Sequence, residues 1–219
     1  MRTVDLQREL VDWSVRNSGF DAARDYIGLS GIADCERVIY DRLREGQRAS
    51  INEQLRTRIS YELEAALVGR LTAMSLYYLP GETISLHGGL VQGHTDGSVS
   101  HNGQEPQEIL EIKTLERETW LPVNGLISRR VAWQVQAYMH YLKRRYTHIV
   151  YLARDTGAIL CLGLKYDLVF GGKIQAKVEL LVKAVQETKR PRCTCRRCKE
   201  NGEISVIVTG TPVIKNESR

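Results

Sequence analysis

The chain has 219 residues, of which 42% are hydrophobic and 26% charged, and its formal net charge is +5. These values exclude a collagen-like, coiled-coil or largely disordered protein, allow one sizeable core or at most two small ones, and permit a polyanionic partner. No apolar run approaches the roughly 18 residues of a membrane span, and the N-terminus lacks the apolar stretch of a secretory signal, so we expect a cytoplasmic protein without membrane contact.

Hydrophobic periodicity predicts helices in the first third of the chain and mostly strands after them. Ser30 is a candidate N-cap for the second helix. The expected helices are 4–17, 33–44, 51–79, 127–145 and 168–188. The expected strands are 83–91, 93–100, 107–114, 147–153, 157–164 and 204–208. This order predicts an α/β or α+β fold with a central mixed sheet.

The strand predicted at 107–114 carries an acidic and a basic residue on one face. Glu111 and Lys113 are separated by one residue, so their side chains project together. Asp96 lies at a strand end or bend before it, and two carboxylates from adjacent strands can share Mg²⁺ or Mn²⁺. A lysine beside them can orient or deprotonate a water, or stabilise charge on a phosphate. Together these groups could hydrolyse a phosphodiester, although Glu-x-Lys alone more often marks a solvated strand.

The helix predicted at 127–145 places Gln134 and Tyr138 on one face, four residues apart. With the preceding acidic motifs, this order resembles the PD-(D/E)XK nuclease superfamily, and most closely its RecB-like branch. The resemblance covers about residues 55–165, roughly half of the chain. It is carried by Gly93, Asp96, Glu111, Lys113, Thr114, Gln134 and Tyr138.

The resemblance implies a restriction-endonuclease-like core, in which a mixed sheet is flanked by helices. Asp96, Glu111 and the backbone carbonyl of Ile112 would bind Mg²⁺ or Mn²⁺, and Lys113 would be the catalytic lysine. Gln134 and Tyr138 would support the site and contact nucleic acid. We therefore expect a single nuclease domain, 1–219, made of a helical segment 1–50, a core 51–190 and a Cys-rich segment 191–219.

The RecB-like branch usually supplies one more metal ligand, a His or Glu, from the helix before the sheet. No histidine occurs between residues 36 and 86, but this helix contains Glu62 and Glu64. The family pattern often has a glycine four residues before the ligand, and Ser60 stands at that distance from Glu64. We therefore expect Glu64 to be the ligand; the alternative is that both glutamates are solvated.

Three of the chain's five cysteines lie close together near its end, at Cys193, Cys195 and Cys198. In a reducing compartment this clustering indicates metal ligation and not disulfide bonds. Cys35 lies far upstream, directly before a predicted helix. The remaining cysteine, Cys161, lies mid-strand and is expected to be a small core residue.

One early cysteine and three late ones resemble the RecB-like nucleases that join their chain ends through a [4Fe-4S] cluster, including CRISPR-associated ones. The resemblance implies that Cys35, Cys193, Cys195 and Cys198 bind such a cluster. Four thiolates would equally satisfy Zn²⁺. The late spacing also differs from the commoner one, because a single residue separates Cys193 from Cys195.

Basic residues surround the late cysteines and follow the helix of Gln134, where they could contact phosphates or lie in solvent. They are Lys143, Arg144, Arg145, Lys189, Arg190, Arg192, Arg196, Arg197 and Lys199. Trp120 lies in a polar loop and could stack on bases, whereas Trp133 is expected in the core. His94 could face substrate or stabilise a turn.

These patterns predict a Mg²⁺- or Mn²⁺-dependent deoxyribonuclease that acts as an exonuclease on single-stranded or frayed DNA ends. DNA repair, CRISPR adaptation and phage DNA processing are all compatible with that activity, and each allows protein partners in a DNA-processing complex. The alternative is a non-catalytic iron–sulfur module that binds nucleic acid. A purely redox or structural iron–sulfur protein would leave the order of the acidic motifs unexplained.

Overall fold

The computed structural model describes residues 24–46, 51–73, 77–100, 108–115 and 127–193. The expected helix at 4–17, the expected strand at 204–208, and Trp120, Cys195 and Cys198 lie outside these ranges, as do Arg196, Arg197 and Lys199. Within the described ranges, no helix combines the length and the apolar character that crossing a membrane requires.

Helices and strands alternate irregularly along the described chain. The helices are α2 (Glu36–Glu45), α3 (Ile51–Ala73), α5 (Arg129–Leu142) and α6 (Leu168–Gln186), with short 3-10 turns η1 (Leu29–Gly31) and η2 (His87–Gly89). The strands are β1 (Ile27–Gly28), β2 (Tyr77–Pro80), β3 (Thr83–Leu86), β4 (Val91–His94), β5 (Gly97–Ser100), β6 (Glu108–Leu115), β7 (Tyr146–Ala153) and β8 (Ile159–Lys165).

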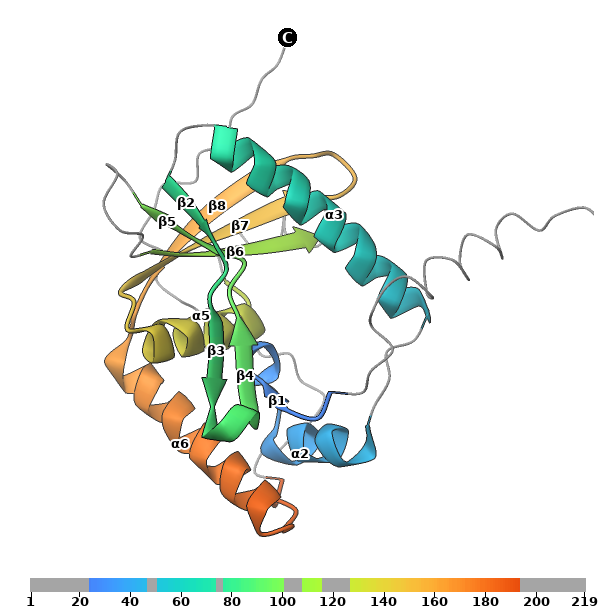
Figure 1. Cartoon of the computed structure of the whole chain (residues 1–219), viewed down its shortest axis with the longest axis vertical. Helices are drawn as coiled ribbons and strands as arrows, with labels where there is room; N and C mark the ends of the chain where they lie inside the picture. The colour runs from blue at the N-terminus through green and yellow to red at the C-terminus, as the bar shows by residue number, and fades with distance from the viewer. Residues whose placement is uncertain (1–23, 47–50, 74–76, 101–107, 116–126, 194–219) are drawn as a thin grey trace, which may run out of the picture.

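The described strands form two sheets that are flanked by helices (Figure 1). The larger sheet has the order β2-β5-β6-β7-β8, and the smaller one has the order β1-β4-β3. The pairs β6–β7 and β1–β4 are parallel and the others are antiparallel, so both sheets are mixed. The predicted fold class is therefore confirmed.

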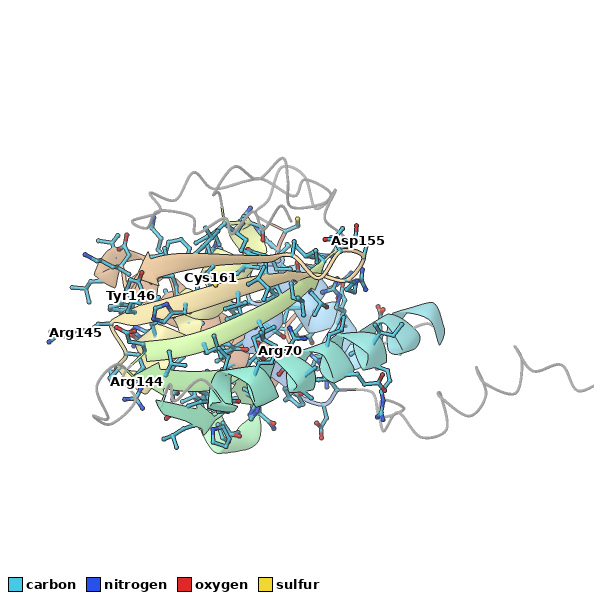
Figure 2. The ribbon with its side chains drawn as sticks, turned by 90° about the horizontal axis from the view of Figure 1, so that it is seen from above. Arg70, Arg144, Arg145, Tyr146, Asp155 and Cys161 are labelled. Atoms are coloured by element: carbon cyan, nitrogen blue, oxygen red, sulfur yellow. The ribbon has the colours of Figure 1, made fainter. Side chains whose placement is uncertain are left out.

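Helices cover both faces of the larger sheet, because β6 and β7 are apolar on both sides. Figure 2 shows α3 running along one face, where Leu67 packs against Leu110, Ile112 and Val150. On the opposite face, α5 and α6 enclose the main core with Ile109, Ile149 and residues of β8. Glu111 lies on this second face of β6, between the apolar residues of the core.

Strands β2 to β5 form one long hairpin that is interrupted in the middle. Pro80 pairs with Gly97 on one side of the interruption, and Thr83 pairs with His94 on the other. On each side of the hairpin, the two residues between these pairs belong to neither strand pairing. One of them is Asp96, whose carboxylate is thereby free to turn toward β6 instead of lying on the face of a strand.

Close backbone contacts fix the shape of this interruption. The Glu82 N–H donates to Thr95 Oγ1 at 2.9 Å, and the Thr95 N–H donates to the Glu82 carbonyl at 3.1 Å. Gly81 is required here, because a Cβ atom would lie 1.7 Å from the Thr95 carbonyl oxygen. The Glu82 carboxylate also accepts hydrogen bonds from Ser98 and Arg144, each at 3.0 Å.

Three details of the expected elements are wrong. The helix predicted at 51–79 ends at Ala73, and Tyr77–Pro80 is instead a strand because it pairs with β5. The strand predicted at 83–91 ends at Leu86 and is followed by the turn η2. Ser30 lies inside η1 and caps no helix, since α2 begins at Glu36 directly after Cys35.

Candidate active site

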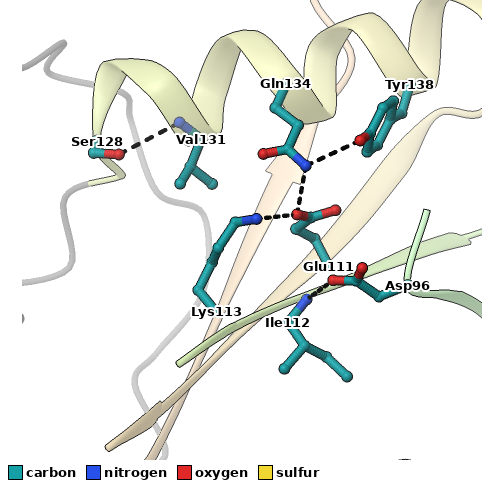
Figure 3. Close-up of polar contacts among 8 residues, drawn as sticks. All are labelled: Asp96, Glu111, Ile112, Lys113, Ser128, Val131, Gln134 and Tyr138. Carbon is teal, nitrogen blue, oxygen red and sulfur yellow. Dashed lines mark hydrogen bonds and ion pairs between the residues drawn. The ribbon is translucent and has the colours of Figure 1, made fainter. Parts of the chain in front are cut away.

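Glu111 is fully buried between β6 and α5, and its two carboxylate oxygens have different surroundings. Oε1 forms an ion pair with Lys113 and accepts a hydrogen bond from Gln134 Nε2 at 2.7 Å (Figure 3). Oε2 is buried and has no hydrogen-bond partner among the described residues. A buried carboxylate oxygen without a partner is costly, so it marks a position that suits a proton or a cation.

Asp96 reaches β6 from the interrupted hairpin. Its Oδ2 accepts a hydrogen bond of 2.6 Å from the Ile112 N–H. The N–H and the carbonyl of one strand residue point to the same edge, so the Ile112 carbonyl also points toward Asp96. The pairing of β5 with β6 ends at Gly97 and Leu110, so β5 does not pair with β6 at Ile112. The Asp96 carboxylate and the Ile112 carbonyl are therefore both at this edge of β6.

Glu64 approaches the same place from α3. One turn earlier, Ser60 accepts a hydrogen bond of 2.6 Å from Thr114 Oγ1 of β6, which fixes this part of the helix against the sheet. Burial raises the pKa of Glu64 to about 7, and the nearby Asp96 carboxylate adds to the shift while Lys113 opposes it. Glu62, in contrast, is exposed and pairs with Arg58 at 3.0 Å. Of the two candidate glutamates, only Glu64 adjoins the buried carboxylates.

The electrostatics of the three carboxylates and the lysine are coupled. Burial raises the pKa of Glu111 to about 8, and it also raises the pKa of Asp96. Burial alone would lower the pKa of Lys113, but the carboxylates of Glu111 and Asp96 outweigh it, so this pKa lies above its ordinary value. Lys113 is therefore charged at neutral pH, whereas the carboxylates retain protons to an unusually high pH.

Gln134 and Tyr138 complete the buried network from α5, which begins after the N-cap Ser128. Gln134 Nε2 also donates to the Tyr138 hydroxyl at 3.0 Å (Figure 3). Gly93 makes room for the tyrosine, since a Cβ atom there would lie 2.9 Å from its ring. The shared helical face predicted for this pair is confirmed. Gln134 orients Glu111, and Tyr138 accepts a second hydrogen bond from the same amide.

The oxygen donors of this site fit a hard divalent cation such as Mg²⁺ or Mn²⁺. Glu111 Oε2 has no partner among the described residues, and the carboxylates of Asp96 and Glu64 are close enough to raise its pKa. Across the described residues, however, no three acidic, histidine or cysteine side chains converge into a ready metal cage. Binding would require Glu64, Asp96 and Glu111 to draw together, which their mutual repulsion opposes until a cation is present.

Cys35 and Cys193 meet although 158 positions of the sequence separate them. Their sulfur atoms are 3.6 Å apart, which is too far for a disulfide bond of about 2.05 Å. Two thiolates bound to one tetrahedral ion would be separated by about 3.8 Å. A four-iron cluster, in which each iron takes one thiolate, would hold them further apart. The thiol pair therefore fits a shared metal group.

Cys161 does not lie in the core, contrary to expectation. It is exposed on β8, on the face that α3 covers elsewhere (Figure 2). The described apolar residues that pack with α3 come from β2, β5, β6 and β7, and none comes from β8. The alternation of β8 therefore buries Leu160 and Leu162 against the main core and leaves the cysteine between them outside.

Several basic and aromatic residues have intramolecular partners. Arg144 pairs with Glu82 at 3.0 Å, and Arg190 pairs with Asp41. Trp133 packs against the core and Phe170, as expected. His94 Nδ1 lies 3.2 Å from the Thr83 hydroxyl, so this histidine contacts the neighbouring strand of its hairpin.

Sequence reasoning missed Tyr61, which lies near Glu64 and Asp96, and Arg24, which lies near Tyr61. Tyr61 lies one turn before Glu64 on α3 and is 51% exposed. Partial burial and the charge of Glu64 raise the pKa of Tyr61, while Arg24 opposes the shift. Arg24 itself lies 5.8 Å from the ring centroid of Tyr26. The helical spacing of Tyr61 and Glu64 was the signal that could have identified this group.

Comparison with known proteins finds similarity in structure but not in sequence. No protein-family model matches the chain, and no curated protein matches it. An alkaline exonuclease, LHK-Exo from Laribacter hongkongensis, has a TM-score of 0.59 and 14% identity, over 81% of this chain and 93% of that chain. Its complex with dAMP gives a TM-score of 0.58 and 14% identity, over 75% and 89% of the two chains. The protein SSO0001 has a TM-score of 0.54 and 17% identity, over 88% of this chain and 92% of that chain. The chain therefore shares the fold of an alkaline exonuclease.

Proposed function

We propose that this protein is a Mg²⁺- or Mn²⁺-dependent deoxyribonuclease of the RecB-like type, acting as an exonuclease on single-stranded or frayed DNA ends. The observation that carries the proposal is the fully buried Glu111. Its Oε1 is held by Lys113 and Gln134, while its Oε2 has no partner among the described residues and lies near two more carboxylates. A purely structural ion pair would not need this crowding of like charges.

Glu64, Asp96, Glu111 and the Ile112 carbonyl would hold the cation. When bound, it supplies Lewis-acid activation of water and neutralises charge on the phosphate. Asp96 is held toward this position by the Ile112 N–H, at 2.6 Å. The strand register of β6 thus fixes Glu111, and the hydrogen bond to the Ile112 N–H holds Asp96, so two of the ligands would start from defined positions.

Lys113 would act as a cation and not as a base. Its pKa lies above the ordinary value because the neighbouring carboxylates outweigh the effect of burial. A charged ammonium beside the scissile phosphate stabilises the negative charge that develops on its oxygens. Of the roles open to a lysine at this position, charge stabilisation and water orientation are the ones that a raised pKa favours.

Gln134 and Tyr138 would orient the site without binding the cation. The Gln134 amide donates to Glu111 Oε1 at 2.7 Å and to the tyrosine hydroxyl at 3.0 Å, so both of its hydrogens are used within the network. This arrangement holds Oε1 and leaves Oε2 available to a cation. The proposed contact of Gln134 and Tyr138 with nucleic acid is less favoured, because both side chains are buried.

DNA would approach past Tyr61 and Arg24. An exposed aromatic ring one turn from Glu64 can stack on a base of a single strand, and the guanidinium can contact a phosphate. The structurally similar exonuclease that was crystallised with dAMP supports a nucleotide as the ligand of this fold. Stacking on every base type would give activity with little sequence preference.

We further propose that Cys35, Cys193, Cys195 and Cys198 bind a [4Fe-4S] cluster, with Zn²⁺ as the alternative. The meeting of Cys35 and Cys193, whose sulfur atoms lie 3.6 Å apart, supports a metal group shared by these segments. The separation itself is nearer to that of two thiolates on one Zn²⁺ than to that on a four-iron cluster, and the cluster rests on the resemblance in cysteine order. Such a group would join the segment before α2 to the segment after α6. Metal analysis and the visible spectrum of the purified protein distinguish the two groups, since only the cluster gives a brown protein.

Cleavage of end-labelled DNA tests the proposed activity. Single-stranded and duplex substrates are incubated with the wild-type protein in Mg²⁺, Mn²⁺ or EDTA, and the products are resolved by length. Lys113→Ala should remove activity, while Lys173→Ala, which removes an exposed lysine from α6, should not. Equal activity of Lys113→Ala and wild type would contradict the assignment. DNA binding without cleavage by the wild type would favour a non-catalytic module.

A further inference from the structure

Two ion pairs connect the same two segments that carry Cys35 and Cys193. We propose that Lys177 and Arg190 are positioning residues that hold these two thiols together as a preformed half of the metal site. The metal group itself rests on the proposed function, but the positioning does not, because every contact that carries it is present without a metal. The two links come from different elements and can be broken separately.

Lys177 contacts the residues on both sides of Cys35, the backbone of Asp34 and the side chain of Glu36. This lysine of α6 is almost fully buried, and its Nζ donates to the Asp34 carbonyl at 2.6 Å. The same Nζ lies 3.3 Å from Glu36 Oε1 and 4.9 Å from the centre of the Trp133 ring. A buried ammonium with partners immediately before and after the cysteine leaves that turn little freedom.

Arg190 fixes the approach of Cys193. Its Nε donates to Asp41 Oδ1 at 2.7 Å, and its Nη2 pairs with Oδ2 of the same carboxylate. Two parallel bonds between a guanidinium and a carboxylate define orientation as well as distance. Hydrogen bonding to Arg190 lowers the pKa of Asp41, so the pair stays charged at neutral pH. Since Asp41 lies in α2, the helix that starts after Cys35, this link joins the two cysteine-bearing segments directly.

The thiol separation follows from these links. Closing a loop between positions 158 apart costs chain entropy, and a metal that found its ligands in separate segments would have to overcome that cost on binding. Here the packing of α2 against α6 and the two ion pairs already offset this entropy cost. The 3.6 Å between the sulfur atoms is the result, and we expect metal to enter a site in which two ligands are in place.

Thiol oxidation in metal-free protein measures this positioning directly. In a background of Cys161→Ser, Cys195→Ser and Cys198→Ser, only Cys35 and Cys193 remain to form a disulfide. Diamide takes up the two electrons and two protons that the thiols lose, and mass spectrometry follows the product. We expect Arg190→Gln to slow disulfide formation severalfold, the loss expected from an exposed ion pair.

Controls separate positioning from charge and from folding. Arg192→Gln removes a cation that is nearer to Cys193 in the sequence. If Arg190 only activates the thiolate through its charge, Arg192→Gln should slow oxidation as much as Arg190→Gln does. If Arg190 positions the thiol, Arg192→Gln should slow oxidation much less than Arg190→Gln does. The exchanged pair Asp41→Arg with Arg190→Asp should restore the rate. Lys177→Met should also slow oxidation, and its urea midpoint shows whether the fold persists. If Lys177→Met fails to fold, Arg190→Gln and the exchanged pair carry the test.

The outcome for the metal is read independently of the outcome for positioning. Arg190→Gln should release its metal to a chelator faster than the wild type, whatever the nuclease activity. One outcome is a wild type that holds no metal and whose two thiols oxidise rapidly, while those of Arg190→Gln oxidise slowly. That result would reject the cofactor and support the positioning role. Unchanged oxidation and unchanged metal release in Arg190→Gln and Lys177→Met, with the fold intact, would overturn the positioning.

Discussion

The two candidate sites of this protein are held together in opposite ways. The carboxylate site is built from neighbouring strands and one helix, by strand register and by residues that are two or four positions apart. The thiol pair is built from segments near the two ends of the described chain, by a lysine hydrogen bond to a backbone carbonyl and an ion pair that span 143 and 149 positions. One site concentrates like charges in the core, and the other balances opposite charges around two thiols.

This difference determines what a metal would do for stability. At the carboxylate site a cation relieves repulsion that folding has created, so removing a ligand should not harm the metal-free fold. At the cysteines a metal group closes a long loop, so removing a ligand should weaken the fold. If both proposals hold, the first site would lower stability in exchange for chemistry, whereas the second would stabilise the fold that carries it.

The largest expected effect is the loss of cleavage when a carboxylate is removed. Asp96→Ala or Glu111→Ala should lower the cleavage rate by about 10³-fold or more, because a charge-stabilising group of the reaction is lost. The unfolding free energy in metal-free buffer should hold or rise. A large fall in the metal-free melting temperature would instead mean that these carboxylates are structural.

Removal of Cys35 should lower stability, in contrast to removal of a carboxylate. Cys35→Ala should lower stability by several kcal/mol, by analogy with cross-links that close long loops, and should abolish bound iron or zinc. The matched control is Cys161→Ala, which removes an exposed thiol outside the pair and should change neither property. A protein without metal, whose melting temperature ignores Cys35→Ala, would reject the four-cysteine site and leave the carboxylate site untouched.

Gln134→Ala should reduce cleavage by about tenfold without abolishing it, because the amide orients Glu111 and binds no cation. Mn²⁺ affinity, measured by calorimetry, should change little. If affinity falls together with activity, Gln134 belongs among the ligands, and the division of roles in this network is wrong.

The pH dependence of metal-free stability should expose the crowded carboxylates. Burial raises the pKa of Glu111 from 4.5 to about 8, so the folded state binds more protons than the unfolded chain between these values. The unfolding free energy should therefore fall as pH rises through this window. Glu111→Gln removes this contribution, so urea denaturation in EDTA at pH 5 and pH 8 should show a smaller decline for the variant. Equal declines in wild type and Glu111→Gln would mean that the pKa of Glu111 is not raised in the folded protein.

The smallest expected effect is at the edge of the carboxylate site. Tyr61→Ala should raise KM for single-stranded DNA severalfold and leave kcat nearly unchanged, since a stacking contact is made equally before and during reaction. Ile59→Ala, on the same helix and 50% exposed, is the control. A fall in kcat with KM unchanged would move Tyr61 from substrate binding to the reaction itself.

Local sequence spacing predicts the carboxylate site and leaves most of its surroundings open. The face shared by Glu111 and Lys113 follows from strand geometry, and that of Gln134 and Tyr138 follows from helix geometry. The interruption of the hairpin at Gly81 was missed, because Tyr77–Pro80 becomes a strand only by pairing with β5. Its segment has no helix breaker before Pro80, so local pattern favoured a helix.

Long-range contacts were out of reach of the sequence. The pairs of Lys177 with Glu36 and of Arg190 with Asp41 depend on how α2 and α6 pack, and nothing in their spacing along the chain indicates a partner. Cys161 looked like a core residue because its strand is apolar, but which face of β8 is covered depends on where α3 lies. Residue type identified the chemistry, and packing determined its surroundings.

The comparison of the two sites depends most on whether the carboxylates bind a catalytic cation. Mn²⁺ binding, followed by electron paramagnetic resonance, should be titrated alongside cleavage of end-labelled single-stranded DNA by the same preparation. We expect the concentrations for half-maximal binding and half-maximal cleavage to agree, and Glu111→Gln to lose both. Cleavage that survives EDTA, or that Glu111→Gln retains in full, would contradict the assignment of this site.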